Sequence, residues 1–204
     1  MKNICIYGAG GFSKEVYWLA LNCGRKVEAF IDLNSNNKMY NNIHVYDQSY
    51  FDPDKHEIVV AVGNPLLRKK ISEEILKEYQ EDVFTNLISN KASLLDPNIK
   101  IGYGSIICDN CVLTCEIEIG NFAQLNLATT VGHESLIKDY FTSAPGVHIS
   151  GKVNIGNNVY FGTNSSVIEN IDICDEVTVG AAACVVKNIT ECGIYVGTPA
   201  KKIK

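Results

Sequence analysis

A histidine and a glutamate stand side by side as His133 and Glu134, in a stretch that otherwise has the composition of strand and turn. An imidazole can take a proton near neutral pH, since the ordinary pKa of a histidine is about 6.5. Glu134 could orient the ring, although adjacent side chains point in different directions and contact between them is not guaranteed. A lone histidine is more often a surface side chain than a base, so the elements that carry His133 must decide between the two interpretations.

The residues around His133 follow a period of six. Stepping by six from Leu95 to Val185 meets sixteen positions, of which fifteen are apolar and only Ser143 is polar. The overall apolar fraction of 46% would give about seven by chance. Glycine often follows the apolar position, and small or β-branched residues often stand two positions before it. This pattern predicts a hexapeptide β-helix in an unbroken register, whose stacked coils share one aliphatic core.

The first part of the chain has a different period. Short apolar runs at 3–7, 27–32 and 57–64 are typical of strands, and amphipathic runs at 12–23 and 66–79 are typical of helices. Strands that alternate with helices predict a small parallel α/β sheet. We therefore expect a Rossmann-like α/β domain over residues 1–85 and a parallel β-helix over residues 86–204.

Composition excludes several classes of function. The net charge is −5, with 18 Lys+Arg against 23 Asp+Glu, which argues against binding nucleic acid. The apolar run at the N-terminus is too short for a signal peptide or a membrane span, so we expect a cytoplasmic protein. Cys108, Cys111 and Cys115 are not completed to a set of four zinc ligands by a second CxxC or a nearby histidine, so we expect no metal site.

Five stretches together resemble a known family. These are "IYGAGGFSKEVYWLA", "AFID", "AVGNPLLRKKI", "GHE" and the terminal "VGTPAKKI". They resemble the bacterial hexapeptide-repeat sugar acetyltransferases, which join a nucleotide-binding α/β domain to a left-handed β-helix. The resemblance implies an acetyl-CoA-dependent N-acetyltransferase for a nucleotide-linked 4-amino-4,6-dideoxy sugar in surface-polysaccharide (O-antigen) assembly. The alternative within the same family is an O-acetyltransferase for sialic acid or another sugar.

In that family three hexapeptides make one coil, so residues 18 apart lie on successive coils. His133 and Gly151 are then neighbours near a corner of the prism. The family mechanism makes His133 the general base, with Glu134 beside it to orient the ring. The backbone N–H of Gly151 is the best candidate for the oxyanion donor, because a residue without a side chain lets the thioester approach closely. Transfer would be direct, with no covalent intermediate.

The resemblance also implies the residues that bind both substrates. Acetyl-CoA would lie in a cleft between two subunits of a homotrimer, and the nucleotide, whether UDP, dTDP or GDP, would lie at the glycine turn that opens the first helix. Where several relatives carry a histidine, this chain has Thr142, and where relatives often have a histidine in the glycine turn it has Phe12. The positions for acetyl-CoA are Thr142, Gly151, Thr163, Ala181 and Lys187, and those for the nucleotide sugar are Gly10, Gly11, Phe12, Asp32, Gly63 and Asn126.

The sequence also bears on three other classes of protein. A zinc carbonic anhydrase on the same kind of helix needs three histidine ligands, and residues 95–204 contain only His133 and His148. An NAD-dependent oxidoreductase is disfavoured because the glycine fingerprint has Ser13 at its third small position. A non-catalytic nucleotide-binding or scaffold protein stays open.

Overall fold

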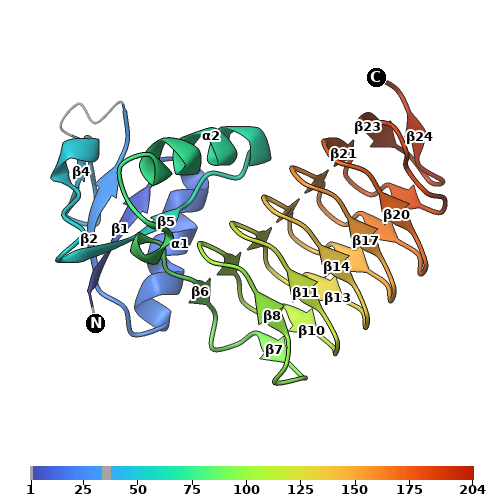
Figure 1. The fold of residues 1–204 in the computed structure, drawn as a ribbon, viewed down its shortest axis with the longest axis horizontal. Coiled ribbons are helices and arrows are strands. Elements are labelled where there is room, and N and C mark those ends of the chain that lie inside the picture. The colour runs from blue at the N-terminus through green and yellow to red at the C-terminus, as the bar shows by residue number, and fades with distance from the viewer. Residues whose placement is uncertain (1, 34–37) are drawn as a thin grey trace.

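The computed structural model describes residues 2–33 and 38–204. An α/β layer at the N-terminal end leans against the first coils of a long prism of short strands, and the chain ends at the far end of that prism (Figure 1). Among the described residues no helix is both long and apolar enough to cross a membrane.

The α/β domain is built on a small sheet with the order β3-β4-β2-β1-β5. The strands β1, β2, β4 and β5 run parallel, and only β3 is antiparallel to its neighbour β4. The strands are β1 (Asn3–Tyr7), β2 (Val27–Ile31), β3 (Met39–Tyr40), β4 (Ile43–Tyr46) and β5 (His56–Val60). The helices are α1 (Gly11–Asn22) and α2 (Pro65–Leu76), and the short 3-10 helices are η1 (Gln48–Tyr50) and η2 (Glu81–Val83). The predicted alternation of strands and helices is confirmed.

Helix α2 differs from its expected form in one informative way. The sequence predicts a helix to residue 79 with Leu67 on its buried stripe, whereas the helix ends at Leu76 and Leu67 is 49% exposed. The buried positions are Pro65, Arg68, Ser72 and Ile75. Two of these four are polar, because this face of α2 lies against the β-helix and donates hydrogen bonds to it.

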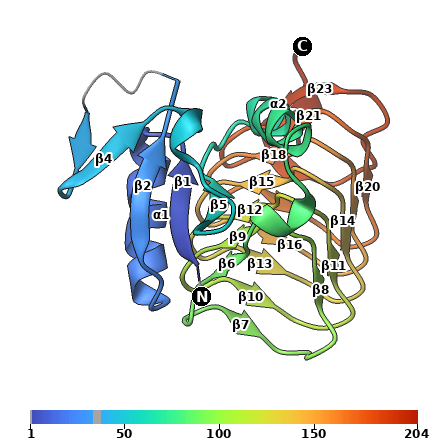
Figure 2. The same cartoon turned by 60° about the vertical axis from the view of Figure 1, so that its left-hand side comes forward.

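The rest of the chain winds as a parallel β-helix with three faces, which we number in the order in which the chain meets them (Figure 2). Face 1 contains β6 (Leu87–Ile88), β9 (Ile106–Ile107), β12 (Gln124–Leu125), β15 (Thr142–Ser143), β18 (Tyr160–Phe161), β21 (Val177–Val179), β23 (Gly193–Val196) and the antiparallel β24 (Lys201–Lys202). Face 2 contains β7 (Ser93–Leu94), β10 (Val112–Leu113), β13 (Thr130–Val131), β16 (His148–Ile149), β19 (Ser166–Val167) and β22 (Cys184–Val185). Face 3 contains β8 (Lys100–Ile101), β11 (Glu118–Ile119), β14 (Leu136–Ile137), β17 (Asn154–Ile155) and β20 (Asp172–Ile173).

The period of six is confirmed from Ile101 onward but is wrong at its first step. Leu113 pairs with Leu94, and Leu95 is 65% exposed. One extra residue in the turn before β8 shifts the register, so Leu94 takes the inward position that the sequence assigns to Leu95. The single polar position on the ladder, Ser143, is fully buried, and its hydroxyl lies 2.8 Å from that of Thr129. A hydrogen-bonded pair of this kind removes the cost of burying a hydroxyl.

The corners of the prism follow one backbone rule. Each coil turns through residues with positive φ, a conformation that costs a side chain about 1–2 kcal/mol. The corner between faces 2 and 3 has Glu116, Glu134, Lys152 and Asn170 in this conformation, with φ from 55° to 59°. The corner between faces 3 and 1 has Gly104, Phe122, Tyr140, Asn158 and Glu176. The α/β domain contacts face 1 at β12 and β15 and covers the second of these corners at Phe122 and Tyr140, through α2, β5 and the loop after β5. The predicted domain boundary at residues 85 and 86 stays a prediction.

Candidate active site

His133 lies on the corner between faces 2 and 3, directly after β13, with 55% of its side chain exposed. Its Nδ1 lies 2.8 Å from Oε2 of Glu134. The positive φ of Glu134, 57°, turns that side chain back beside its neighbour, which explains contact between adjacent residues. An Nδ1–H that donates to this carboxylate leaves the Nε2 lone pair of His133 free to take a proton.

The carboxylate of Glu134 is held in its charged form. The hydrogen bond from His133 holds the pKa of Glu134 below its ordinary value, so the group is ionised at neutral pH. Lys152 stands one coil further on, and its Nζ lies 3.6 Å from the same oxygen. Sequence reasoning missed Lys152, although the spacing of 18 from Glu134 could have indicated it. A carboxylate fixed between an imidazole and an ammonium group is well placed to orient the ring.

Gly151 provides the room that the imidazole occupies. A side-chain Cβ at Gly151 would lie 2.6 Å from Nε2 of His133, closer than such contacts allow. Among residues 2–33 and 38–204, no backbone hydrogen bond uses the N–H of Gly151. The corner therefore combines an imidazole, a carboxylate bound to its Nδ1 and an unused backbone N–H on two adjacent coils.

A cavity of about 630 Å³ opens at the carboxyl edge of the parallel strands in the α/β domain. It is lined by Tyr7 at the end of β1, Gly8 after β1, Asp32 after β2, Val62 after β5 and Leu67 on α2, among others. Asp32 accepts a hydrogen bond of 3.0 Å from the N–H of Ala9, which ties the ends of β1 and β2 together. Ligands of open α/β sheets bind at this edge, where the chain order of the strands reverses.

The glycine turn lies beside this cavity. Gly10 caps the start of α1 without a side-chain hydrogen bond, and Gly11 is its first residue. Both are exposed, whereas Phe12 is half-buried and packs against the apolar core beneath α1. A smaller cavity of about 170 Å³ includes Gly10 and Lys14. The uncapped N–H groups of α1 and a nearby ammonium group offer donors for an anion.

Gly63 and Thr142, which the sequence assigns to different substrates, lie in contact. The Thr142 hydroxyl donates to the carbonyl of Gly63 at 2.9 Å, and Thr142 is only 5% exposed. Its side chain is therefore held in the interface between the domains. Asn126 lies at the corner between faces 1 and 2, where its side-chain oxygen accepts from the N–H of Leu127 at 2.8 Å.

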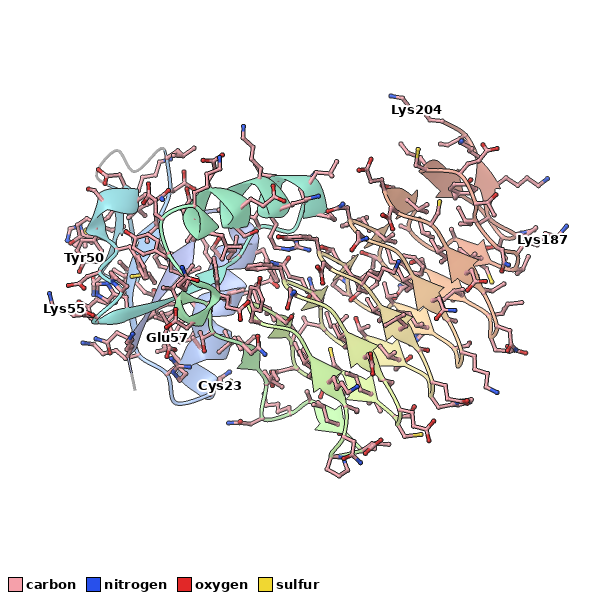
Figure 3. All side chains as sticks on the ribbon, in the orientation of Figure 1. Cys23, Tyr50, Lys55, Glu57, Lys187 and Lys204 are labelled. Atoms are coloured by element: carbon pink, nitrogen blue, oxygen red, sulfur yellow. The ribbon has the colours of Figure 1, made fainter. Side chains whose placement is uncertain are left out.

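Thr163 and Ala181 lie on that same corner, one coil apart, and both are exposed. The whole width of face 2 separates them from the corner of His133 and Gly151 in one chain. Lys187 is exposed at the far end of the β-helix, close to the C-terminal strands (Figure 3). One copy of the chain thus brings together His133, Glu134 and Gly151, but does not bring Thr163, Ala181 or Lys187 to them.

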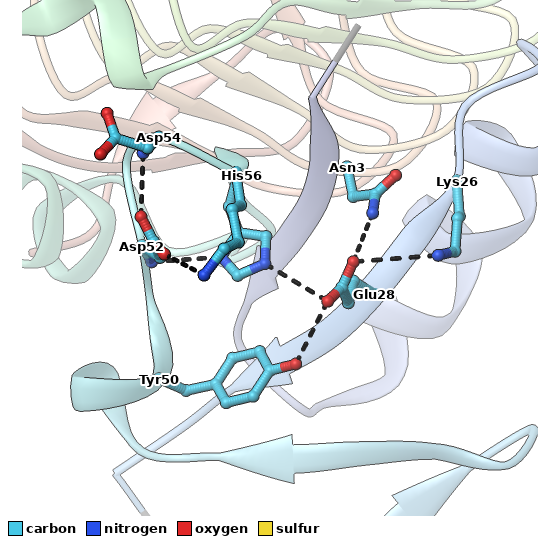
Figure 4. Close-up of polar contacts among 8 residues, drawn as sticks. Asn3, Lys26, Glu28, Tyr50, Asp52, Asp54 and His56 are labelled. Atoms are coloured by element: carbon cyan, nitrogen blue, oxygen red, sulfur yellow. Dashed lines mark hydrogen bonds and ion pairs between the residues drawn. The ribbon is translucent and has the colours of Figure 1, made fainter.

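The remaining histidines lie elsewhere. His148 points outward from face 2 and contacts the Thr130 hydroxyl at 3.0 Å. His56 is buried at the amino edge of the parallel sheet, opposite the cavity, with Nε2 3.5 Å from Glu28 and Tyr50 stacked against its ring (Figure 4). No group of three or more His, Cys, Asp or Glu side chains with metal-binding geometry occurs within residues 2–33 and 38–204.

The fold and the corner together define a hexapeptide-repeat β-helix protein with an exposed imidazole and a glycine N–H on adjacent coils, which are groups of the kind that acyl transfer uses. Comparisons with known proteins agree with this class. Residues 3–75 match the model of the PglD N-terminal domain family. Over 175 residues the chain is 28% identical to a GDP-perosamine N-acetyltransferase from Escherichia coli O157:H7, a match that covers 81% of this chain and 78% of that protein.

Solved structures extend the likeness to the whole chain. The acetyltransferase domain of PglB from Neisseria gonorrhoeae FA1090 is 27% identical over 100% of both chains, with a TM-score of 0.90. The same domain in complex with acetyl coenzyme A gives a TM-score of 0.87 over 99% of both chains at 27% identity. A histidine-to-asparagine mutant of perosamine N-acetyltransferase from Caulobacter crescentus, in complex with CoA and GDP-perosamine, shares the fold, with a TM-score of 0.90 and 23% identity over 100% of this chain and 98% of that one.

These comparisons confirm three predictions from the sequence. The chain resembles the hexapeptide-repeat sugar acetyltransferases, its fold is an α/β subdomain followed by a left-handed β-helix, and it is an enzyme of the acetyl-CoA-dependent class.

Proposed function

We propose that the protein is an acetyl-CoA-dependent N-acetyltransferase that acts on the amino group of a nucleotide-linked 4-amino-4,6-dideoxy sugar. The observation that carries the proposal is the corner at His133, where Glu134 fixes one ring nitrogen and Gly151 makes room for the other. The amino-sugar substrate is supported by the E. coli relative, whose substrate is GDP-perosamine, and this favours GDP among the three nucleotides.

In the proposed reaction the sugar amine attacks the carbonyl carbon of the acetyl thioester, and Nε2 of His133 takes the proton that the amine loses. The N–H of Gly151 donates to the oxyanion of the tetrahedral intermediate, whose charge it stabilises in the transition state. When the C–S bond breaks, the imidazolium returns its proton to the departing sulfur of CoA. Atoms and protons balance without a covalent enzyme intermediate.

The nucleotide part would occupy the cavity at the carboxyl edge of the sheet. Its diphosphate would bind at the start of α1, at Gly10 and Gly11, beside Phe12, because the unused N–H groups and the helix dipole favour an anion there. Asp32, which lines the cavity, would accept a hydrogen bond from the ribose or the base. Gly63 and Asn126 would flank the path of the sugar from this cavity to the β-helix.

Acetyl-CoA would bind between two chains of a homotrimer. Within one chain, face 2 separates His133 from Thr163 and Ala181, so the contacts assigned to acetyl-CoA can meet only if neighbouring chains contribute different corners. The outward side chains of face 2 carry no Lys, Arg, Asp or Glu, unlike those of face 3, where Lys100, Glu118 and Asp172 point outward. A face without such charges is the better candidate for packing against another chain. Lys187 keeps its predicted acetyl-CoA role as part of this proposal, whereas the burial of Thr142 between the domains argues against the contact with acetyl-CoA that the sequence assigns to it.

The acceptor can be identified with one panel of reactions. The purified protein is incubated with acetyl-CoA and, in turn, GDP-, UDP- and dTDP-linked 4-amino-4,6-dideoxy sugars, the matching 4-hydroxy sugars and sialic acid, while CoA thiol is followed. We expect thiol release and an acetylated product with at least one amino sugar and none with its hydroxyl counterpart. Activity confined to hydroxyl acceptors would replace the proposal with O-acetylation.

The trimer can be tested by complementation between two inactive variants. His133→Ala removes the base on one corner, and Ala181→Arg blocks the other corner. Co-expression with two affinity tags yields mixed oligomers in which some sites combine an intact corner from each chain, so we expect activity to return. Activity absent from mixed oligomers, or single-chain masses in light scattering, would contradict a shared site. Roles in surface-polysaccharide assembly and in the cytoplasm stay predictions.

A further inference from the structure

Arg68 on α2 is fully buried, with 0% of its surface exposed. No carboxylate in residues 2–33 and 38–204 forms an ion pair with it, and its hydrogen bonds go to carbonyl, amide and hydroxyl oxygens. Burial lowers the pKa of the guanidinium to about 9, which still leaves it charged at neutral pH. Burying a charge without an opposite charge is costly, so its neighbours must justify its presence.

The guanidinium of Arg68 joins two successive coils of the β-helix. Nε donates to the carbonyl of Phe122 at 2.9 Å, and Nη2 donates to the carbonyl of Tyr140 at 2.9 Å. These two residues occupy the same turn on adjacent coils. On the neighbouring strands, Nη1 donates to Oε1 of Gln124 at 3.0 Å, and Nη2 donates to the hydroxyl of Thr142 at 2.8 Å.

The same side chain also holds the end of β5. Nη1 donates to the carbonyls of Val62 at 2.6 Å and Gly63 at 3.3 Å. Val62 lines the cavity in the α/β domain, and so do Leu67 and Ile71 on the helix that carries Arg68. Thr142 is in the coil that begins at the corner of His133. One guanidinium therefore contacts both the rim of the nucleotide cavity and the coil that carries the base.

We propose that Arg68 is a positioning residue that fixes the nucleotide cavity at a set distance and angle from His133, so that the amine of a bound nucleotide sugar reaches the base. This inference rests on the proposed function. A planar group with five donors can hold two coils and a loop at once, which a lysine with one flexible ammonium group cannot do. Misplacement of about 1 Å at a reacting centre can cost about 10²-fold in rate.

A role confined to packing would give a different result. If Arg68 served only to pack the core, its replacement would lower thermal stability and would weaken every activity through loss of folded protein. A positioning role instead lowers turnover of the nucleotide sugar while each substrate still binds its own domain. The readouts must therefore separate kcat from substrate affinity.

The test compares Arg68→Lys, Gln124→Met and Arg25→Met with the natural protein. Arg68→Lys keeps the positive charge but loses the planar guanidinium with its five donors. Gln124→Met removes one hydrogen-bond acceptor of Arg68 while nearly preserving side-chain volume. Arg25→Met is the matched control, because Arg25 binds Glu57 inside the α/β domain and, within residues 2–33 and 38–204, none of its hydrogen bonds or ion pairs reaches the β-helix. For each variant the measurements are kcat with the nucleotide sugar, the Kd values of the nucleoside diphosphate and of CoA by calorimetry, and amide hydrogen exchange at Val62–Asn64.

For Arg68→Lys we expect kcat to fall by about 10²-fold with both Kd values unchanged, and exchange at 62–64 to rise. Gln124→Met should give a smaller loss of the same kind, and Arg25→Met should leave kcat unchanged. The inference is overturned if kcat with Arg68→Lys equals that of the natural protein, or if the Kd values weaken in proportion to kcat. If the natural protein itself transfers no acetyl group, the proposed function fails, while nucleotide binding and hydrogen exchange still report whether Arg68 couples the domains.

Discussion

Two corners of the same β-helix have the same backbone turn and opposite surroundings. Glu134 and Tyr140 are six residues apart, and both have positive φ, 57° and 60°. The corner at Glu134 is open to solvent and carries polar side chains. The corner at Tyr140 is covered by the α/β domain, and Tyr140 stacks on Phe122 with ring centroids 5.2 Å apart.

The difference shows how one repeated turn serves two purposes. At the open corner the turn brings Glu134 against His133, whose ring lies beside Gly151 on the next coil. At the covered corner the turn directs aromatic rings into the core of the α/β domain, where Tyr140 also meets the hydroxyl of Ser72 at 3.2 Å. The repeat fixes the backbone conformation of both corners. Packing of the α/β domain decides which corner stays open to a ligand and which becomes part of the interface between the domains.

Loss of the base should have the largest effect on the open corner. His133→Ala should lower kcat/KM by about 10²–10⁴-fold, the usual contribution of a positioned general base. Thermal stability should change little, because the side chain is more than half exposed. The matched control is His44→Ala, which removes an exposed histidine from β4 of the α/β domain, away from the proposed interface between chains. Equal kcat/KM for His133→Ala and the natural protein would remove the base from the mechanism.

The covered corner should respond in stability. Phe122→Ala removes a fully buried ring from the interface between the domains and should cost about 3–5 kcal/mol of unfolding free energy. Glu116→Ala also introduces an alanine at a residue with positive φ, but at the open corner. It should cost no more than about 1 kcal/mol of unfolding free energy. Urea titration of both variants measures the two losses of unfolding free energy. Similar losses would show that packing of the α/β domain does not distinguish the two corners.

The room beside the imidazole can be closed with one methyl group. In Gly151→Ala the new Cβ would meet Nε2 of His133, so the ring must move. We expect a loss of about 10²-fold in kcat with little change in melting temperature, because the ring can turn into solvent. The parallel change Gly24→Ala, in the turn after α1, places its Cβ where nothing lies within 4 Å, and it gives a kcat reference outside both proposed sites. A kcat for Gly151→Ala equal to that of the natural protein would show that the position of the ring is unimportant.

A smaller effect should appear at alkaline pH. Burial raises the pKa of Tyr140 above its ordinary value. Below about pH 10 the phenol keeps its proton in both folded and unfolded chains, and at higher pH the unfolded chain loses the proton first, so stability falls as pH rises. Between about pH 8 and about pH 11 the melting temperature should therefore fall further for the natural protein than for Tyr140→Phe. An equal fall in melting temperature for the two proteins would show that ionisation of Tyr140 does not contribute to the pH dependence of stability.

Much of this architecture follows from the sequence, because the spacing of apolar residues fixes which side chains face inward. Gly151 as the neighbour of His133 follows from the length of one coil. The extra residue before β8 could not be foreseen, since Leu94 and Leu95 are both leucine and either could take the inward position. The contact of Glu134 with His133 depends on a positive φ at a glutamate, which residue type does not indicate.

Arg68 shows the other limit of reasoning from sequence. An arginine on an amphipathic helix is ordinarily assigned to solvent, and the apolar periodicity of this helix predicts a buried stripe through Leu67 and Ile71. The buried face is instead selected by carbonyl groups on the β-helix that need donors. Contacts between domains are absent from the periodicity of either domain alone.

The most direct test of the mechanism is a rapid-quench experiment with acetyl-CoA labelled in the acetyl group and a nucleotide-linked 4-amino-4,6-dideoxy sugar. Direct transfer at His133 predicts that label leaves acetyl-CoA and enters the sugar amide in step with thiol release, with no label on the protein at any time. Label retained on the protein before it reaches the sugar, or thiol released without an acetylated amine, would contradict the account.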